Sequence, residues 1–208
     1  MKAKPCLIAC SVLREEIERL VEQGDLDAEL VFGSKHFHMD YGLLEKDLRQ
    51  IIKKVLSRFL GEVILVCWDL CLSPNDEMKT LTEEPGVVKV DAQNCVDCLL
   101  GGKAKSSEAD PDHDLLFLGP GMIGFFDRIQ EKARQENIDE AALTNLFSGL
   151  KGIVPLDTLG EVEKHKVEIE TMHTSLTTLE TKQIGINNLK QILLEAIERG
   201  KRKTGRNP

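Results

Sequence analysis

Short runs of apolar residues alternate along this chain with longer segments in which apolar residues recur every three or four positions. The short runs have the length of β-strands, and the continuous run at residues 63–67 is typical of a strand buried on both faces of a parallel sheet. The longer segments have the periodicity of amphipathic helices. This alternation predicts an α/β fold, similar to a Rossmann fold, with a mostly parallel sheet of about six strands flanked by helices.

Capping residues and glycines mark where the predicted helices begin and end. Ser11 is suited to cap the first helix, which Gly24 ends, and Asp40 opens the strongest helical pattern, which ends at Gly61. Strands are predicted at residues 6–10, 28–32, 63–67, 87–90, 115–118 and 153–156. Later helices are predicted from near Asn94, up to Gln135, and at about Asp139–Leu150, Glu161–His173 and Asn187–Arg199. We expect a single domain over residues 1–208, with residues 160–200 as a C-terminal helical segment packed on it.

The charge balance argues against nucleic acid as a partner. The chain carries 35 acidic and 27 basic residues, for a formal net charge of −8, and aromatic residues make up only 4% of it. Binding phosphates needs a basic surface, and stacking bases needs aromatic side chains. No apolar run approaches the roughly 20 residues of a membrane span, and the apolar run near the start is too short for a signal peptide. We therefore expect a cytoplasmic protein without a membrane partner.

Six cysteines in such a chain favour reduced thiols, metal ligands or catalysis over structural disulfides. Cys10, His38, Cys71 and Cys95 each lie just past one of the first four predicted strands. Because parallel strands end at a common edge, all four side chains would face the edge at which such sheets bind ligands. Three thiolates and one imidazole suit zinc, and thiolate-rich sets also suit iron–sulfur clusters. The pattern therefore predicts a transition-metal site.

The sequence allows more than one role for the other cysteines. Cys98 lies one helical turn beyond Cys95, which permits a chelating pair, a redox pair or a substitute ligand. Cys6 and Cys67 fall inside predicted strands, where we expect them to pack in the core. Three polar residues could supply hydrogen bonds around the metal ligands: Asp69, Gln93 and Asn94.

A separate pattern, Gly119-x-Gly121-x-x-Gly124, follows a predicted strand and opens a helix, as a dinucleotide-binding fingerprint does. The rest of such a unit is missing, because the next acidic residue after a strand is Asp157 and an additional helix intervenes. Helix capping and close packing also explain glycines at these positions. A dinucleotide-binding oxidoreductase is therefore a second alternative.

Several short segments also form a set by their order and spacing: Ile8-Ala9-Cys10, His38, Leu70-Cys71, Asn94-Cys95, Leu99-Leu100-Gly101, Pro120-Gly121, Leu156-Asp157 and Leu159-Gly160. In this set the chain resembles the domain-of-unknown-function family number 1638, which is associated with methanogenic archaea and other anaerobes. The resemblance covers most of the chain. It implies an α/β domain in which the three cysteines and the histidine recur as a site. It supplies no established reaction, and it carries a loose association with genes of corrinoid-dependent methyl transfer.

The chain departs from this family pattern at two places. Gln93-Asn94 stand where the family has His-Asp, and Trp68-Asp69 stand where it has Tyr-Gly. Where the family residues act as acids, bases or hydrogen-bonding partners of a ligand, this member lacks the corresponding ionisable groups.

The function predicted from these residues is metal binding, with zinc or an iron–sulfur cluster at the carboxyl edge of the sheet. Zinc with an open coordination position would activate a thiol or another nucleophile for methyl transfer, and a cluster would transfer electrons. A partner enzyme or a corrinoid protein is the expected partner. The first alternative is a non-catalytic accessory protein that binds a partner, and whether the protein is an enzyme is left open.

Overall fold

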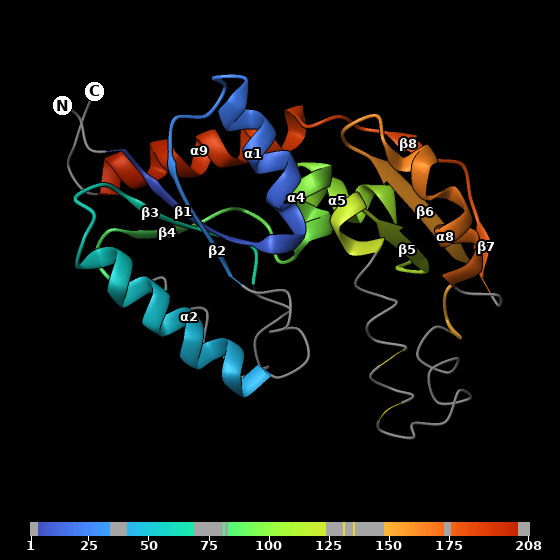
Figure 1. Cartoon of the computed structure of the whole chain (residues 1–208), viewed down its shortest axis with the longest axis horizontal. Helices are drawn as coiled ribbons and strands as arrows, with labels where there is room; N and C mark the ends of the chain where they lie inside the picture. The colour runs from blue at the N-terminus through green and yellow to red at the C-terminus, as the bar shows by residue number, and fades with distance from the viewer. Residues whose placement is uncertain are drawn as a thin grey trace. The chain divides into compact units, whose positions relative to one another are not determined.

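The computed structural model describes residues 4–33, 41–68, 81, 83–123, 131, 135, 148–172 and 176–203. The chain forms two compact units. The first unit consists of Met1–Lys105 with Ile186–Pro208, and the second consists of Ser106–Gly185. Each unit contains its own four-stranded sheet, and both sheets are parallel (Figure 1).

The first unit is built on a sheet with the strand order β2-β1-β3-β4. β1 (Cys6–Cys10) pairs in parallel with β2 (Glu29–Gly33) on one side and with β3 (Val63–Val66) on the other. β4 (Val87–Lys89) pairs with β3 and forms an edge of the sheet. The direction in which successive strands are added reverses after β2. The carboxyl ends of β1 and β3 therefore form a topological switch point.

The two central strands have the composition that their position requires. Every residue of β1 and of β3 is buried, and nearly all are apolar. Strands covered by helices on both faces read as continuous apolar runs, because neither side of the strand meets water. These two runs are the strongest strand signals in the chain.

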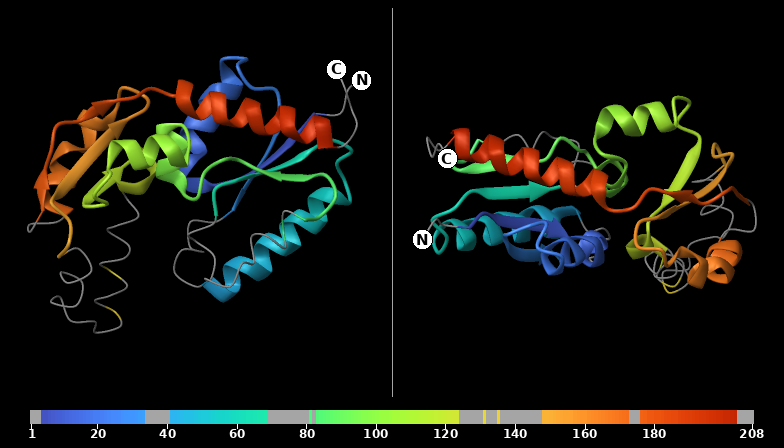
Figure 2. Two further views of the ribbon diagram at one scale, coloured as in Figure 1. Left: turned by 180° about the vertical axis from the view of Figure 1, so that it is seen from behind. Right: turned by 90° about the horizontal axis from the view of Figure 1, so that it is seen from above.

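Helices cover both faces of the first sheet. η1 (Ser11–Leu13) and α1 (Arg14–Glu22) follow β1, and α2 (Tyr41–Leu56) follows β2. α9 (Asn187–Lys203) and α2 lie on opposite faces of the sheet (Figures 1 and 2). Helices on both faces are what right-handed crossovers produce when the order of the strands reverses.

The C-terminal helix α9 is anchored on β3 and β4. Gly200 lies so close to the sheet that a Cβ there would be 2.9 Å from Cγ of Glu62. The side chain of Arg199 donates a hydrogen bond to the carbonyl oxygen of Lys89 at 2.7 Å, and Lys203 donates to that of Val87 at 3.1 Å. These bonds occupy carbonyl groups of the edge strand, which would otherwise be open to another strand.

The second unit contains a sheet centred on β6 (Gly152–Asp157). β5 (Leu115–Leu118) pairs in parallel with one side of β6. β7 (Thr177–Thr178) and β8 (Lys182–Gln183) pair with successive parts of its other side, also in parallel. Because β7 and β8 are short and largely exposed, backbone pairing with β6 is what defines them.

Two helical segments pack on the second sheet: η4 (Val162–His165) contacts β6, and α8 (Lys166–Met172) contacts β7. α5 (Lys103–Ala109) precedes β5 and has no buried residue. The core of this unit is a buried cluster with one residue each from β5, the turn of helix after it, β6, η4 and α8: Leu118, Ile123, Ile153, Val162 and Ile169. It is smaller than the core around β1 and β3.

The α/β class, the parallel strands and the C-terminal helix are confirmed, but a single sheet of about six strands is wrong. The described residues form two four-stranded sheets, because the runs at residues 115–118 and 153–156 pair with each other. Residues 160–200 contain β7 and β8 besides helices, and α9 belongs to the first unit. The single domain over residues 1–208 stays a prediction. The helix predicted at about Asp139–Leu150 lies largely outside the described residues.

Candidate functional site

Two cysteines lie side by side where the two central strands of the first sheet end. Ala9 of β1 is the register partner of Val66 of β3, and Cys10 and Cys67 are the next residues of the two chains. Both cysteines are fully buried. Their position is the topological switch point, where open α/β sheets bind their ligands. The strand order therefore brings two thiols to the place in this fold that is best suited to a site.

The backbone after β3 adopts an unusual conformation at two residues that are not glycine. Cys67 has φ 75° and Trp68 has φ 90°, and this region costs an L-amino acid roughly 1–3 kcal/mol. The Trp68 side chain is buried, and its indole nitrogen donates a hydrogen bond to the carbonyl oxygen of Ile8 at 3.4 Å. Gly33 permits this packing, because a Cβ there would lie 2.5 Å from the indole ring. The indole thus holds Cys67 in a conformation that is typical of functional sites.

The other two described cysteines of the site lie on α4 (Cys95–Leu100), a short helix that is capped at both ends. The side-chain oxygen of Asn94 accepts a hydrogen bond from the backbone nitrogen of Asp97 at 2.9 Å, and the Asp97 carboxylate accepts one from the backbone nitrogen of Gln93 at 2.9 Å. Gly101, with φ 94°, ends the helix in the left-handed conformation. The caps hold Cys95 and Cys98 in fixed positions.

The thiols of α4 meet Cys67. The sulfur atoms of Cys67 and Cys98 are 3.0 Å apart, and the Cys67 thiol is also within hydrogen-bonding reach of Cys95. Burial raises the pKa of the Cys67 thiol well above its ordinary value, and hydrogen bonds to Cys95 and Cys98 raise it further. Cys67 is therefore a neutral thiol that joins the end of β3 to α4. The described cysteines form no disulfide.

The predicted site residues fall into two groups. Cys10 and Cys95 lie buried at the carboxyl edge, as expected, and Cys98 lies one turn further along α4. His38, Asp69 and Cys71 lie outside the described residues, so the fourfold ligand set stays a prediction. Hydrogen bonding around the ligands by Gln93 and Asn94 also stays a prediction, since their described bonds belong to the cap of α4.

Cys6 and Cys67 both pack in the core as expected, Cys6 within β1. Only the predicted strand at residues 63–67 is one residue too long at Cys67. β3 ends at Val66, so Cys67 is the first residue beyond it and occupies the same level of the sheet as Cys10. The signal for this was present in the sequence, because both cysteines close an apolar run of similar length. What the sequence hides is the left-handed backbone that ends the strand early.

Within the described residues, no group of three or more histidine, cysteine, aspartate or glutamate side chains is arranged to hold a metal ion. The geometry of Cys67 and Cys98 shows one reason. Two sulfurs bound to one tetrahedral zinc at about 2.3 Å lie about 3.8 Å from each other. The observed 3.0 Å is shorter, so Cys67 and Cys98 are arranged as a pair of thiols in this structure. Cys98 as a substitute metal ligand stays a prediction.

The glycine pattern lies in the second unit. Gly119 follows β5, and its carbonyl oxygen accepts a hydrogen bond from the backbone nitrogen of Met122 at 3.0 Å. Gly121 lies in the helical turn that follows, and Gly124 is outside the described residues. These contacts are those of a helix start. Dinucleotide binding stays a prediction.

A β-bulge in the second unit creates a pocket. Ile153 of β6 is in register with Thr178, but Leu156 is in register with Lys182, so the neighbouring segment has one residue more than β6. Pro155 lies at the interruption, and proline has no N–H to offer to a ladder. The chain therefore bends away from β6 between β7 and β8.

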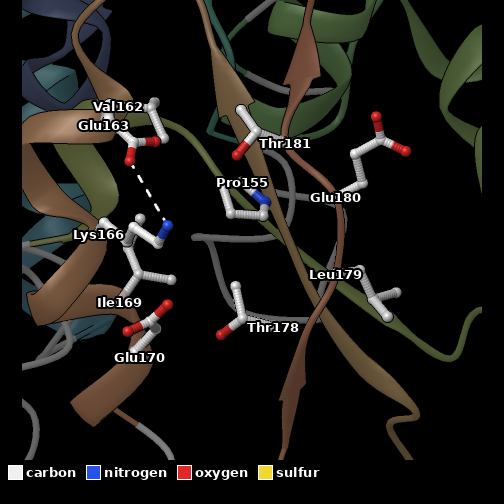
Figure 3. Close-up of a pocket in the computed structure, with 10 residues that line it drawn as sticks. All are labelled: Pro155, Val162, Glu163, Lys166, Ile169, Glu170, Thr178, Leu179, Glu180 and Thr181. Atoms are coloured by element: carbon white, nitrogen blue, oxygen red, sulfur yellow. Dashed lines mark ion pairs between the residues drawn. The ribbon is translucent and has the colours of Figure 1, made fainter.

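The pocket of about 330 Å³ lies between this bulge and α8 (Figure 3). Pro155 lies between the two walls, and a Lys166–Glu163 ion pair of 3.5 Å spans one of them. The lining mixes acidic, hydroxyl and apolar side chains: Pro155, Val162, Glu163, Lys166, Ile169, Glu170, Thr178, Leu179, Glu180 and Thr181. It contains none of the cysteines, so it is separate from the thiol site of the first unit.

The fold and the site define a parallel α/β protein with buried cysteines at the switch point of its first sheet. The chain belongs to the family described as "Protein of unknown function (DUF1638)", whose model matches residues 32–193. The match covers more than half of the chain and confirms the resemblance expected from the sequence. It includes three of the four predicted ligands, His38, Cys71 and Cys95, while Cys10 lies before it.

No curated protein and no solved structure matched the chain. Among the helices in the described ranges, none combines the length and the apolar character needed to cross a bilayer.

Proposed function

We propose that the protein binds a transition metal, zinc or an iron–sulfur cluster, at the carboxyl edge of the first sheet. The proposed ligands are Cys10, Cys71, Cys95 and His38. The observation that carries the proposal is the position of Cys67, which follows β3 at the level of Cys10 and lies within hydrogen-bonding reach of Cys95. Cys67 thus links the proposed ligand Cys95 of α4 to the edge at which the proposed ligand Cys10 ends β1.

Chain order supports the two remaining ligands. Cys71 is three residues along the sequence from Trp68, and His38 is five residues from the end of β2 at Gly33. Both segments begin at the same carboxyl edge, because β2 and β3 run parallel to β1. A set of three thiolates and one imidazole is chemically suited to zinc, and a thiolate-rich set to a cluster.

The burial of the thiols fits a metal centre. Cys10 is fully buried and Cys95 is 6% exposed, so water has little access to a metal ion bound by them. Metal ligands must be deprotonated, so binding releases protons and is stronger at higher pH. For methyl transfer to or from a thiol, a corrinoid protein is the partner we propose; for a cluster, the partner is an electron-transfer enzyme.

Metal content tests the proposal. We expect wild-type protein, purified without oxygen from a metal-replete host, to contain near-stoichiometric zinc or iron. Cys10→Ser, Cys71→Ser, Cys95→Ser and His38→Ala should each lose most of it, because each removes one of four bonds to the metal. Absorbance near about 400 nm indicates a cluster, and a colourless metalloprotein indicates zinc.

Cys6→Ser is the matched control. Cys6 is a fully buried cysteine of β1, as Cys10 is, but it lies at the opposite end of the strand. The variant should keep its metal if the carboxyl edge holds the site. Wild-type protein without metal, or equal loss of metal in Cys6→Ser and Cys10→Ser, would contradict the proposal.

A further inference from the structure

Cys67 and Cys98 lie close enough for one disulfide bond to join them. Their sulfurs are 3.0 Å apart, and a disulfide needs about 2.05 Å, so the bond requires a movement of about 1 Å in all. Both side chains are fully buried, and 31 positions separate them in the sequence. Such proximity between distant residues comes from the fold and not from their place in the chain.

The backbones of both cysteines are held in place by neighbouring residues. Trp68, packed against Gly33 and bonded to Ile8, fixes the backbone of Cys67. The caps of α4 fix the backbone of Cys98. Two cysteines that are positioned before reaction lose little conformational freedom when they are joined, so the native state favours the bond.

The pair is distinct from the proposed ligands. Cys10 and Cys95 belong to the proposed metal site, whereas the 3.0 Å spacing of Cys67 and Cys98 is too short for two ligands of one ion. The contact of Cys67 with Cys95 connects the two sets. Joining Cys67 to Cys98 would therefore change the immediate surroundings of a proposed ligand.

We propose that Cys67 and Cys98 form a reversible disulfide by exchange with a low-molecular-weight disulfide. One of the two protein thiols gives up its proton and attacks the small disulfide, whose S–S bond breaks; the first small thiolate leaves and takes up a proton. The second protein cysteine then attacks the mixed disulfide, and the second small thiol leaves in the same way. The two protein sulfurs together lose two electrons, which the small disulfide gains.

The disulfide forms with or without a metal, so the test uses metal-free protein. The full chain is treated with a chelator, incubated with oxidised glutathione, and then denatured and alkylated. We expect two of its six thiols to escape alkylation, and peptide mapping to find Cys67 joined to Cys98. Dithiothreitol should restore six alkylated thiols.

Cysteine-to-alanine variants identify the two thiols that form the disulfide. Cys67→Ala and Cys98→Ala should each abolish the loss of two thiols, while Cys6→Ala should leave it unchanged. Cys95→Ala should also leave the Cys67–Cys98 bond in place, although it removes a proposed metal ligand. Six alkylated thiols after oxidation, a bond between another pair, or a bond that dithiothreitol does not reduce would overturn the inference. Since metal content is measured on reduced protein, failure of one proposal is distinguishable from failure of the other.

Discussion

Trp68→Ala is expected to destabilise the protein by about 3–5 kcal/mol, the usual cost of removing a buried tryptophan. The side chain is 1% exposed and packs over the end of β1 against Gly33. Removing it leaves a cavity at the switch point and frees the backbone of Cys67. Chemical denaturation of reduced protein, followed by circular dichroism, measures the loss.

Two companion variants separate packing from backbone strain. Trp68→Gly should be more stable than Trp68→Ala by roughly 1 kcal/mol, because glycine tolerates φ 90° and alanine does not. Gly33→Ala should lower the free energy of unfolding by about 1–3 kcal/mol in the wild type, where its Cβ meets the indole. In the Trp68→Ala background, where the indole is absent, it should cost almost nothing. A loss below about 1 kcal/mol for Trp68→Ala, or equal costs of Gly33→Ala in both backgrounds, would contradict this account of the edge.

Cys6 should make stability depend on pH in alkaline solution. Burial raises the pKa of the Cys6 thiol from 9.0 to about 11, and the nearby Glu29 carboxylate adds to the effect. Between these values the unfolded chain loses the Cys6 proton while the folded protein keeps it, so ionisation favours unfolding. The contribution is present in full below about pH 9, falls as pH rises to about 11, and amounts to about 2–3 kcal/mol.

The comparison with Cys6→Ala isolates this effect from other groups that titrate in the same range. The free energy of unfolding of the wild type minus that of Cys6→Ala should fall by about 2–3 kcal/mol between pH 8.5 and pH 11.5. Glu29→Gln should reduce the fall, because it removes the negative charge near the thiol. A difference that stays constant over this range would show that Cys6 ionises equally in both states.

The pattern of apolar residues predicted the centre of the first unit well. β1 and β3 are continuous buried runs, and the helix that carries Cys95 begins just after Asn94, near the predicted start. These signals are local, because burial on both faces and capping depend on residues close in sequence. The position of Cys10 and Cys95 at the carboxyl edge follows from them.

The division into two sheets could not be predicted in the same way. The runs at residues 115–118 and 153–156 resemble the earlier runs, and no local feature states which strands they pair with. β7 and β8 are polar two-residue strands that exist through backbone pairing with β6. Their side chains therefore carry no strand pattern.

The thiol pair was missed for a related reason. Cys67 stands at the end of an apolar run, and only its left-handed backbone turns it toward α4. Residues other than glycine rarely adopt this conformation, and the packing of Trp68 that supports it joins residues about 60 positions apart. Long-range packing of this kind has no signature in the sequence near Cys67.

X-ray absorption spectroscopy at the zinc or iron edge of anaerobically purified wild-type protein tests the central claim most directly. The proposed site predicts a first shell dominated by sulfur at about 2.3 Å; for zinc, it also contains one nitrogen at about 2.0–2.1 Å. Cys95→Ser should reduce the sulfur contribution, and Cys6→Ser should leave it unchanged. A shell of oxygen and nitrogen alone, or protein without bound metal, would contradict a thiolate metal centre at this edge.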